Sequence, residues 1–568
     1  MRLNDFNRKL KNEYKNTFKK TKIKRNWNFQ FKLRYVFLGV FVLVFISLFI
    51  EHIYVQIYNS ILDDRIEERI NSKEISTINN KSDYQKAKTS YSFYEKVSTL
   101  TSLLSIRIGC SDARGELGTG EMPQSPETNN SYETNVQTKG IDEADVSKCD
   151  GNYVYSLVKN SLVVYKLDGT VVASVNDDGK EIYVSDNYII SIGYYSSVIY
   201  EFNNGILTEK YILSYKSYID SRLKDNRVYF VVSNDISEEN INYGNCFYDG
   251  MCFPTTLYSI VEYDLNTLEV NSVQTLSGNN ACIYMSDNNF YIASTSYLTD
   301  SMTSIMMYNH ELEPIGVMKV KGTTLNQFSM DEYNNYFRIV TTDNTQEAER
   351  LNAISIFDLS NLSLVGYLNE GIGIGRQTIR SVRFDKDTCY AVTYENFDPL
   401  YEISLEDPTN PVIISKYEAP GFSNYLHTFT INGEEYVLGL GFTDNRSDTK
   451  ISVYKNTTDT AQVGQDYILG YDNYYNQCDY INRQLNTYMF TNHKSLFIYN
   501  DGTYLFLGAN VAFDEYVIFK IDVNNSYPVS IYKTISLNDR YDVRSFLIDG
   551  KLLVTTYDGL LVIDWMSE

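Results

Sequence analysis

A short polar segment between residues 142 and 150 holds the densest group of side chains that could do chemistry. Asp142, Glu143, Asp145, Lys148 and Asp150 fall within nine residues. Carboxylate oxygens suit hard cations, so one hypothesis is a calcium or ligand site. The acids do not follow the spacing of an EF-hand loop, so no motif indicates calcium or another metal. We favour a structural interpretation, in which the segment leads into a first β-sheet, pairs Lys148 with a neighbour and turns after Asp150.

Two further residues are candidates for ligand binding. Arg383 lies in "IRSVRF" at the start of an expected strand. It could hold an anionic ligand in a central channel, or pair with an inner carboxylate such as Asp385, which we favour. His427 lies in "YLHTF" beside Tyr425 and Leu426. A lone histidine in such a run is typical of a packed strand residue rather than of a catalytic base.

Motifs of known catalytic sites are missing from the sequence. The run "GIGIGR" at 371–376 lacks the G-x-G-x-x-G spacing of a dinucleotide site, and no G-x-S-x-G motif occurs. The sialidase Asp-box is absent as well, and only four histidines could serve as the base of a Ser-His-Asp site. Paired carboxylates could still serve a glycosidase or lyase, but a sequence does not give their separation in space. The sequence therefore favours a non-enzymatic protein without a cofactor.

Seven cysteines are too scattered for a disulfide framework. Cys246 and Cys252 in "CFYDGMC" form the one close pair. They either form a disulfide that closes a small surface loop or remain two unpaired thiols. A zinc site is not indicated, because it would need a second pair or nearby histidines.

The elements that position these residues are expected to be strands. Beyond Tyr132, short runs rich in Val, Ile, Tyr and Phe alternate with Asn, Asp and Gly turns. A loose repeat of roughly 35 to 55 residues recurs to the C-terminus, as in "VSDNYIISIG", "LKDNRVYFVVS" and "MSDNNFYIAST". In each unit an acidic or Asn turn precedes an apolar strand.

Such units cannot bury both faces of a sheet alone, and radial stacking solves this problem. We therefore predict an all-β protein, a β-propeller of about eight four-stranded blades, with seven or nine as alternatives. A last partial unit at the C-terminus would complete the ring by joining strands from both ends of the chain. A β-sandwich array or a β-solenoid is the structural alternative.

The N-terminal part has a different organisation. Residues 1–34 are predicted to be a basic cytoplasmic tail, and 35–55 a single transmembrane helix acting as a signal anchor, with a cleaved signal peptide as the rival. Residues 56–108 are predicted to form a membrane-proximal helical stalk, or else a solvated spacer. Residues 109–131 are rich in Gly, Ser, Pro and acids and are predicted to be a flexible linker. The propeller domain then occupies residues 132–568.

Charge supports this division. Residues 1–34 carry twelve Lys or Arg against two acids, a net of +10, which leaves −32 for the remainder. Because basic residues near a span stay cytoplasmic, the acidic C-terminal body is expected outside the cell. An acidic exterior argues against nucleic acid as a partner.

Several long stretches resemble a known family. The segment "YETNVQTKGIDEADVSKCDGNYVYSL" at 132–157 resembles the opening of a family of secreted bacterial and archaeal proteins with a C-terminal β-propeller distantly related to WD repeats. Matching stretches follow in the family's order at 325–342, 379–429 and 543–564, so the resemblance covers about 132–565. It implies a propeller fold and an extracytoplasmic address, and no established activity. Cys149 and Thr428 depart from the family's usual Thr and Pro, which suggests that neither position is a chemical centre.

The sequence leads to three functional hypotheses. The favoured one is a membrane-anchored binding or scaffolding protein. Its partners would be the lipid bilayer, through residues 35–55, and an unknown cell-envelope protein, peptide or glycan held by Tyr-rich loops. The alternative is a propeller-type hydrolase or lyase that acts on extracellular polymer. The third is a structural module that spaces other components of the envelope.

Overall fold

The described part of the chain is built from short apolar strands. In this computed structural model all described residues belong to one compact unit, Ile70–Glu568. The predicted tail, transmembrane helix and linker lie outside the described residues, and no helix within those residues is long and apolar enough to cross a membrane. The structure describes residues 72–88 and 134–565, apart from 251–253, 298–300, 344–350, 374, 395–397, 420, 445, 456–460, 471–484, 486, 491, 512–514 and 538–542.

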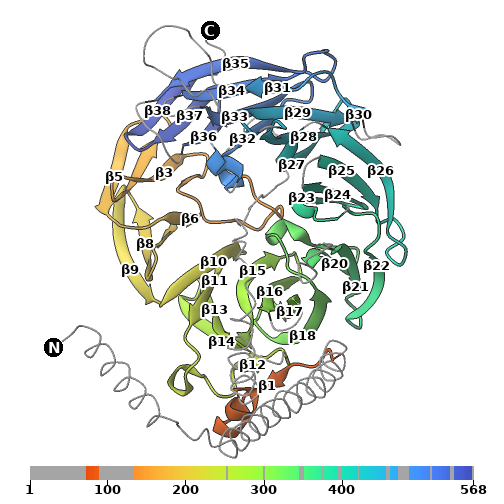
Figure 1. Cartoon of the computed structure of the whole chain (residues 1–568). Helices are drawn as coiled ribbons and strands as arrows, with labels where there is room; N and C mark the ends of the chain where they lie inside the picture. The colour runs from red at the N-terminus through yellow and green to blue at the C-terminus, as the bar shows by residue number, and fades with distance from the viewer. Residues whose placement is uncertain are drawn as a thin grey trace, which may run out of the picture. The chain divides into compact units, whose positions relative to one another are not determined.

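Nine sheets of mainly antiparallel strands lie around a central axis as the blades of a propeller in the described residues (Figure 1). Consecutive strands pair within each blade, and the first strand of each blade lies nearest the axis. The predicted all-β propeller fold is confirmed. Short 3₁₀ helices η1 (Glu238–Asn240), η2 (Gln327–Ser329), η3 (Thr487–Phe490) and η4 (His493–Ser495) lie in the connections.

The blades are numbered here in chain order. Blade 1 is β2 (Ser147–Cys149), β3 (Tyr153–Val158), β4 (Ser161–Lys166) and β5 (Val171–Asn176); blade 2 is β6 (Glu181–Ser185), β7 (Tyr188–Ile192), β8 (Ser196–Asn203) and β9 (Ile206–Ser214); blade 3 is β10 (Ser217–Lys224), β11 (Arg227–Asn234), β13 (Thr256–Asp264) and β14 (Glu269–Ser277). Blade 4 is β15 (Asn279–Met285), β16 (Asn289–Tyr297), β17 (Ser301–Asn309) and β18 (Pro314–Lys321); blade 5 is β19 (Met330–Tyr333), β20 (Tyr336–Asp343), β21 (Leu351–Asp358) and β22 (Ser363–Leu368); blade 6 is β23 (Thr378–Asp385), β24 (Thr388–Tyr394), β25 (Asp398–Ser404) and β26 (Val412–Ala419). Blade 7 is β27 (Phe422–Ile431), β28 (Glu434–Phe442) and β29 (Thr449–Lys455) with the short β30 (Ala461–Gln462) and β31 (Tyr467–Leu469); blade 8 is β32 (Phe497–Asn500), β33 (Leu505–Val511), β34 (Glu515–Ile521) and β35 (Val529–Ser536); blade 9 is β36 (Arg544–Ile548), β37 (Lys551–Thr556) and β38 (Gly559–Asp564).

The repeated Asn and Asp turns seen in the sequence join the strands nearest the axis to their neighbours. Asp225 and Asn226 connect β10 to β11 with φ angles of 50° and 60°, and Asn334 and Asn335 connect β19 to β20 with 50° and 66°. Positive φ at both central residues is the type I′ geometry that matches the twist of a hairpin, and Asn and Asp tolerate it. These local signals set the hairpin register of the blades.

Hydrophobic packing between neighbouring blades closes the ring. Apolar residues on facing sheets form buried clusters at the junctions, for example Ile182 and Phe202 of blade 2 against Leu162 of blade 1. One larger cluster spans the junctions of blades 6, 7 and 8. The last junction joins Phe546 and Leu553 of blade 9 to blade 1. Each buried large side chain contributes roughly 1.5–3 kcal/mol. The core is therefore distributed around the ring instead of lying at its axis.

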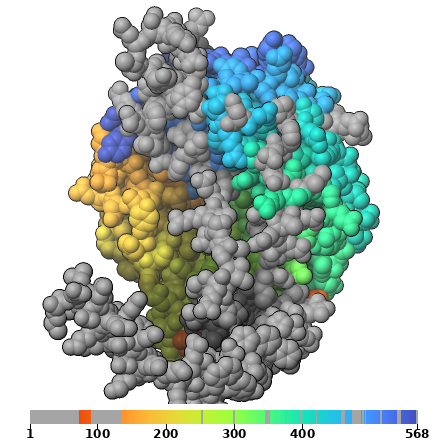
Figure 2. All heavy atoms as spheres, in the orientation of Figure 1, coloured from red at the N-terminus to blue at the C-terminus, as the bar shows by residue number. Residues whose placement is uncertain are grey.

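The two ends of the propeller do not share a blade. We expected the partial C-terminal unit to complete a blade with strands from the start of the domain. Instead β2 supplies the inner strand of blade 1 from the same local meander, and the last unit stands alone as a three-stranded blade. The number of blades is nine, within the predicted range but above the favoured eight. Figure 2 shows these blades following one another around the described surface, from orange blade 1 to blue blade 9.

Blade 3 carries two extra strands on its outer edge. β12 (Cys246–Tyr248) pairs parallel with β14, and β1 (Ser76–Thr77) pairs with β12. A helix over 81–88 follows β1, and Asn80 caps it by accepting hydrogen bonds from the backbone N–H groups of Ser82 and Asp83. Residues 72–88 belong to the predicted stalk. This described part of it is docked on the propeller.

The cysteine pair is described in part. Cys246 on β12 is fully buried and carries a free thiol, and burial raises its pKa to about 12. It packs with Ile78, Leu257 and Leu276. The sequence left open a disulfide that closes a small surface loop or two unpaired thiols, and the pairing of β12 with β14 places Cys246 inside the core. Cys252 lies outside the described residues.

Candidate functional site at the centre of the ring

The segment that leads into blade 1 crosses the centre of the ring (Figure 1). We call residues 134–146 the opening segment. Its backbone forms single antiparallel bridges from Asp142 to Leu223 of β10 and from Asp145 to Ile182 of β6. Blades 2 and 3 are thereby tied to the segment before the chain enters β2.

Side chains of the opening segment reach further blades. The Asn135 amide donates to the carbonyl of His493 at 3.0 Å. The Gln137 amide donates to the carbonyls of Gln327 at 2.9 Å and Met330 at 3.0 Å. These bonds satisfy carbonyl groups at the start of blade 5 and in the connection before blade 8. The opening segment therefore links parts of the ring that are far apart in the sequence.

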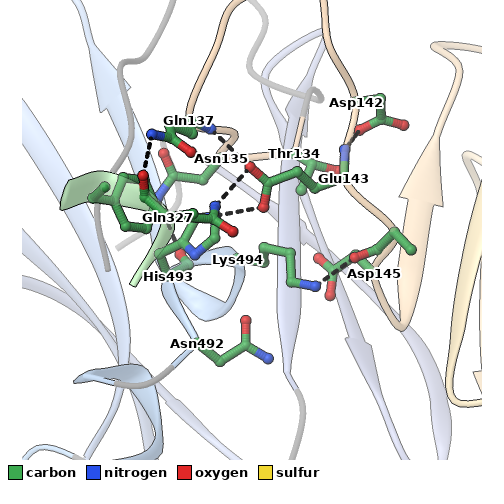
Figure 3. Close-up of polar contacts among 12 residues, drawn as sticks. Thr134, Asn135, Gln137, Asp142, Glu143, Asp145, Gln327, Asn492, His493 and Lys494 are labelled. Atoms are coloured by element: carbon green, nitrogen blue, oxygen red, sulfur yellow. Dashed lines mark hydrogen bonds and ion pairs between the residues drawn. The ribbon is translucent and has the colours of Figure 1, made fainter. Parts of the chain in front are cut away.

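Glu143 is the central acceptor of this region (Figure 3). Its side chain is 4% exposed. Oε1 accepts hydrogen bonds from the Gln137 backbone N–H and the Gln327 amide, both at 3.0 Å. Oε2 lies 3.1 Å from Nε2 of His493. One carboxylate thus joins the opening segment to η2 and η4.

Charge around Glu143 keeps it ionised. Burial by itself raises the pKa of this carboxyl, but attraction to Arg222, His493 and Lys494 together outweighs burial and lowers the pKa well below its usual range. Arg222 on β10 lies 2.9 Å from Asp220 and donates to the Gln327 side chain at 2.7 Å. Asp220 and Glu143 raise the pKa of Arg222 against the opposing effect of burial.

Other charged groups of the opening segment are also paired. Asp142 lies 2.6 Å from Nζ of Lys148. Asp145 accepts from Arg544 of β36, with 2.9 Å and 2.7 Å from Nε to the two carboxylate oxygens. Nη2 of Arg544 also lies 2.7 Å from Oδ1 of Asp145, so two nitrogens of the guanidinium tie the segment to blade 9, the last blade of the chain. Lys494 beside His493 forms a further pair with Glu181 of β6 at 2.5 Å.

Three carboxyls near this region have raised pKa values. Burial is the main cause for Asp142, Glu181 and Asp220, and nearby Lys148, Lys494 and Arg222 respectively reduce the effect. No group of three or more His, Cys, Asp or Glu side chains in the described residues could hold a metal ion. The arrangement is a network of matched ion pairs that holds blades together through charge. We call this network the central tie.

Of the residues predicted in the opening cluster, Asp142, Glu143, Asp145 and Lys148 meet in this network. Asp150 does not. Its carboxylate accepts from the backbone N–H groups of Asn152 and Tyr153, both at 2.7 Å, and from the Tyr155 hydroxyl at 2.8 Å. Asp150 therefore shapes the turn between β2 and β3.

Arg383 and His427 lie on the facing inner strands β23 and β27. Arg383 is 4% exposed, and its guanidinium makes no hydrogen bond or ion pair with a described residue. Burial lowers its pKa, and Asp385 opposes this effect only through longer-range attraction. His427 is fully buried, with Nδ1 3.5 Å from the Tyr425 hydroxyl. The direct Arg383–Asp385 pair that the sequence suggested does not form.

A second candidate region is a cleft beside blade 3. Its volume is about 530 Å³. The helix over 81–88 forms one wall and the ends of β10, β11 and β13 form the other. The lining combines an aromatic ring, apolar groups, amides, hydroxyls and charges: Tyr84, Ala87, Lys88, Lys216, Ser217, Ser233, Asn234, Asp235, Ile236, Pro254, Thr255, Thr256 and Leu276.

Sequence reasoning missed most partners of the central acids. Gln327, His493 and Lys494 come from connections between blades, and Arg222 and Arg544 from inner strands. Only the motif context of Gln327 and Arg544 gave a signal, because they lie in the family-like stretches at 325–342 and 543–564. Nothing local in the sequence pairs Glu143 with a residue 350 positions away.

Comparisons with known proteins agree with the fold. The beta propeller domain family matches residues 131–542. An uncharacterised protein of Methanocaldococcus jannaschii is 26% identical over 423 residues, which cover 56% of this chain and 66%, just under two thirds, of that relative. An uncharacterised protein of Archaeoglobus fulgidus is 26% identical over 436 residues, covering 57% of this chain and 68% of the relative.

Solved structures with lower identity are also similar. A eukaryotic initiation factor aligns at 11% identity and a TM-score of 0.41, covering 72% of this chain and 96% of its own. AztD from Citrobacter koseri aligns at 9% identity and a TM-score of 0.37, with the same two coverages. The family match spans most of the chain and the whole of blades 1 to 8. The chain therefore belongs to the beta propeller domain family.

Proposed function

We propose that this protein is a membrane-anchored, extracytoplasmic binding or scaffolding protein, and that its cell-envelope ligand docks in the cleft beside blade 3. The cleft is the observation that carries the proposal. Its volume of about 530 Å³ lies within the range of small-molecule and short-segment sites, roughly 300–1,000 Å³. The lysines, amides and hydroxyls of the lining offer hydrogen bonds to a polar ligand.

In this proposal the central network of ion pairs has a structural role and does not bind the ligand. Its carboxylates are already engaged with cations or backbone donors, so they hold the blades together. A rigid ring of this kind presents the cleft in one geometry, which lowers the entropy lost on binding. The proposal thus divides the molecule into a charged tie at the axis and a binding surface near its edge.

Binding can be tested with the full chain in lipid nanodiscs. Isolated envelope peptides and envelope polysaccharides serve as separate probes, and bound and released material is identified by mass spectrometry. We expect saturable binding that Lys216→Glu reduces at least tenfold, because Lys216 lines the cleft. Lys166→Glu, at an exposed lysine on blade 1, is the matched control and leaves binding unchanged.

Equal binding by both variants would place the ligand elsewhere and overturn the assignment of the cleft. Release of shortened polysaccharide would instead favour the hydrolase or lyase alternative. Absence of saturable binding to any probe would favour the spacer module.

The membrane anchor, predicted over residues 35–55, rests on the apolar run at 35–50 and on the basic residues before it. Alkaline extraction of cells that express the full chain tests it. We expect the chain to stay with the membrane and external protease to digest the propeller while a tag at residue 1 is protected. Recovery of the chain in the alkaline supernatant would contradict the anchor.

A further inference from the structure

Arg383 differs from the other buried cations of the described residues. Lys148, Arg222, Arg338, Lys450 and Arg544 each lie within ion-pair distance of a carboxylate. Lys319 donates to the carbonyl of Ser72. Arg383 is equally buried and makes neither kind of contact with a described residue. A buried charge without a partner lowers the stability of the folded state by several kcal/mol. We therefore expect a counter-charge beside Arg383.

Blade 3 contains an equivalent arginine that is satisfied. Arg222 lies on the inner strand β10 opposite Tyr229, two residues before the hairpin turn. Arg383 lies on the inner strand β23 opposite Tyr390, also two residues before the hairpin turn. Both strands have a register shift at the same point. It lies just before Asp220 in β10 and just before Ser381 in β23, and each of these residues is two positions before the arginine. The two arginines therefore occupy the same position of the blade.

Blades 3 and 6 differ in the residue two positions before the arginine. Residues i and i−2 of a strand share one face. In blade 3 this residue is Asp220, whose carboxylate lies 2.9 Å from Arg222. In blade 6 it is Ser381, which is fully buried and whose hydroxyl has no hydrogen-bond partner among the residues that the structure describes. Blade 6 keeps the cation and lacks the carboxylate.

We propose that blade 6 binds a small oxyanion between Ser381 and Arg383, in the place that the Asp220 carboxylate occupies in blade 3. A carboxylate or a tetrahedral oxyanion accepts from a guanidinium through two oxygens and from a hydroxyl through a third contact. The site does not involve the cleft beside blade 3.

The test uses the full chain in nanodiscs and follows thermal unfolding in a zwitterionic buffer. Acetate and sulfate are titrated separately at ionic strength held constant with potassium chloride. A ligand that binds only the folded state raises Tm with its concentration. We expect Tm of the wild type to rise with at least one of the two anions and Tm of Arg383→Met to stay flat.

Ser381→Asp is the more specific test, because it gives blade 6 the carboxylate that Asp220 supplies at the same position of blade 3. We expect this variant to melt above the wild type without added oxyanion and to respond to neither anion, because its own carboxylate fills the site. Ser381→Asn is the matched control of similar size, and it melts no higher than the wild type. An equal response of the wild type and Arg383→Met to both anions would overturn the proposal.

Crystals of the wild type provide a measurement that does not depend on a variant. A selenate soak is expected to give a selenium anomalous peak between Ser381 and Arg383. A water molecule there, in crystals grown with sulfate and soaked with selenate, would show that solvent satisfies the arginine and would contradict an oxyanion site.

Discussion

Two segments from the N-terminal side of the propeller bind the ring by different means. Residues 72–88 dock on the outer edge of blade 3 through strand pairing with β12 and through buried Ile78, Tyr84 and Ala87. Their ion pair with the propeller, Lys81 to Glu238, is exposed to solvent. The opening segment crosses the centre and relies on Glu143 and other buried charges.

The difference follows from what each surface offers. The edge of blade 3 presents an unpaired strand and an apolar surface, which a short strand and an amphipathic helix cover. At the axis the ends of several inner strands converge with cations and free carbonyl groups. An apolar segment would leave those groups buried without partners, so a charged segment is required there.

The largest expected effect tests the central tie. Glu143→Gln keeps the shape of the side chain but leaves Arg222, His493 and Lys494 without their shared negative charge. We expect a loss of about 3–5 kcal/mol in the free energy of unfolding, measured in urea. Glu269→Gln, at an exposed position of β14, is the control and changes stability by less than about 0.5 kcal/mol. A loss below about 1 kcal/mol would mean that the network is not a tie.

The outer edge is expected to depend on volume instead of charge. Tyr84 is 2% exposed, and its hydroxyl has no hydrogen-bond partner within the described part of the chain. Tyr84→Ala is expected to cost about 3 kcal/mol through lost burial and a cavity, measured by the same urea titration. Tyr84→Phe removes only the unpaired hydroxyl and is expected to be neutral or slightly stabilising. Equal losses in both variants would show that the hydroxyl is bonded in solution.

The pH dependence separates the two regions further. The folded pKa of Glu143 lies well below the value of about 4.3 expected in the unfolded chain. Its stabilising contribution is therefore fully present above that pH and is lost as pH falls through the folded pKa. We expect the difference between wild type and Glu143→Gln to be constant from pH 7 to 5 and to shrink as the pH falls from there towards 2.5.

Two comparisons check this result. The difference between wild type and Tyr84→Ala is expected to be the same at every pH. The total stability of the wild type has opposing contributions, since raised folded pKa values of Asp142, Glu181 and Asp220 favour the folded state at low pH and lose that effect as pH rises. Only the difference between variants isolates Glu143, and a constant difference below pH 4 would contradict its depressed pKa.

The smallest expected effect concerns an exposed contact between the first and last blades. Lys159 and Asp558 lie 2.6 Å apart and are each about half exposed. A double-mutant cycle with Lys159→Ala and Asp558→Ala is expected to give a coupling of about 0.2–1 kcal/mol that disappears in 1 M salt. A larger, salt-independent coupling would mean that closure of the ring depends on surface charge as well as on its core.

Local sequence signals determined the blades. Alternating apolar residues and the Asn and Asp turns, such as Asp225–Asn226, define hairpins without reference to the rest of the chain, so the propeller fold was predictable. The dense acids at 142–150 indicated a place of unusual charge, and Asp142, Glu143 and Asp145 of the opening segment lie in the network of ion pairs. The number of blades was harder to predict. A separate three-stranded last blade and a last blade completed by a strand from the start of the domain give the same order of strands along the sequence.

Tertiary structure alone decided which charges meet. Glu143 finds His493 and Gln327 because a closed ring brings its inner strands and connections to one axis, and no local pattern encodes that distance. Arg222 and Arg383 look alike as residues in β-strands, and only the strand register reveals that they are equivalent and that Asp220 has no counterpart in blade 6. The sequence specifies strands through contacts between near neighbours, while the electrostatic balance at the axis is a sum over residues that the fold brings together.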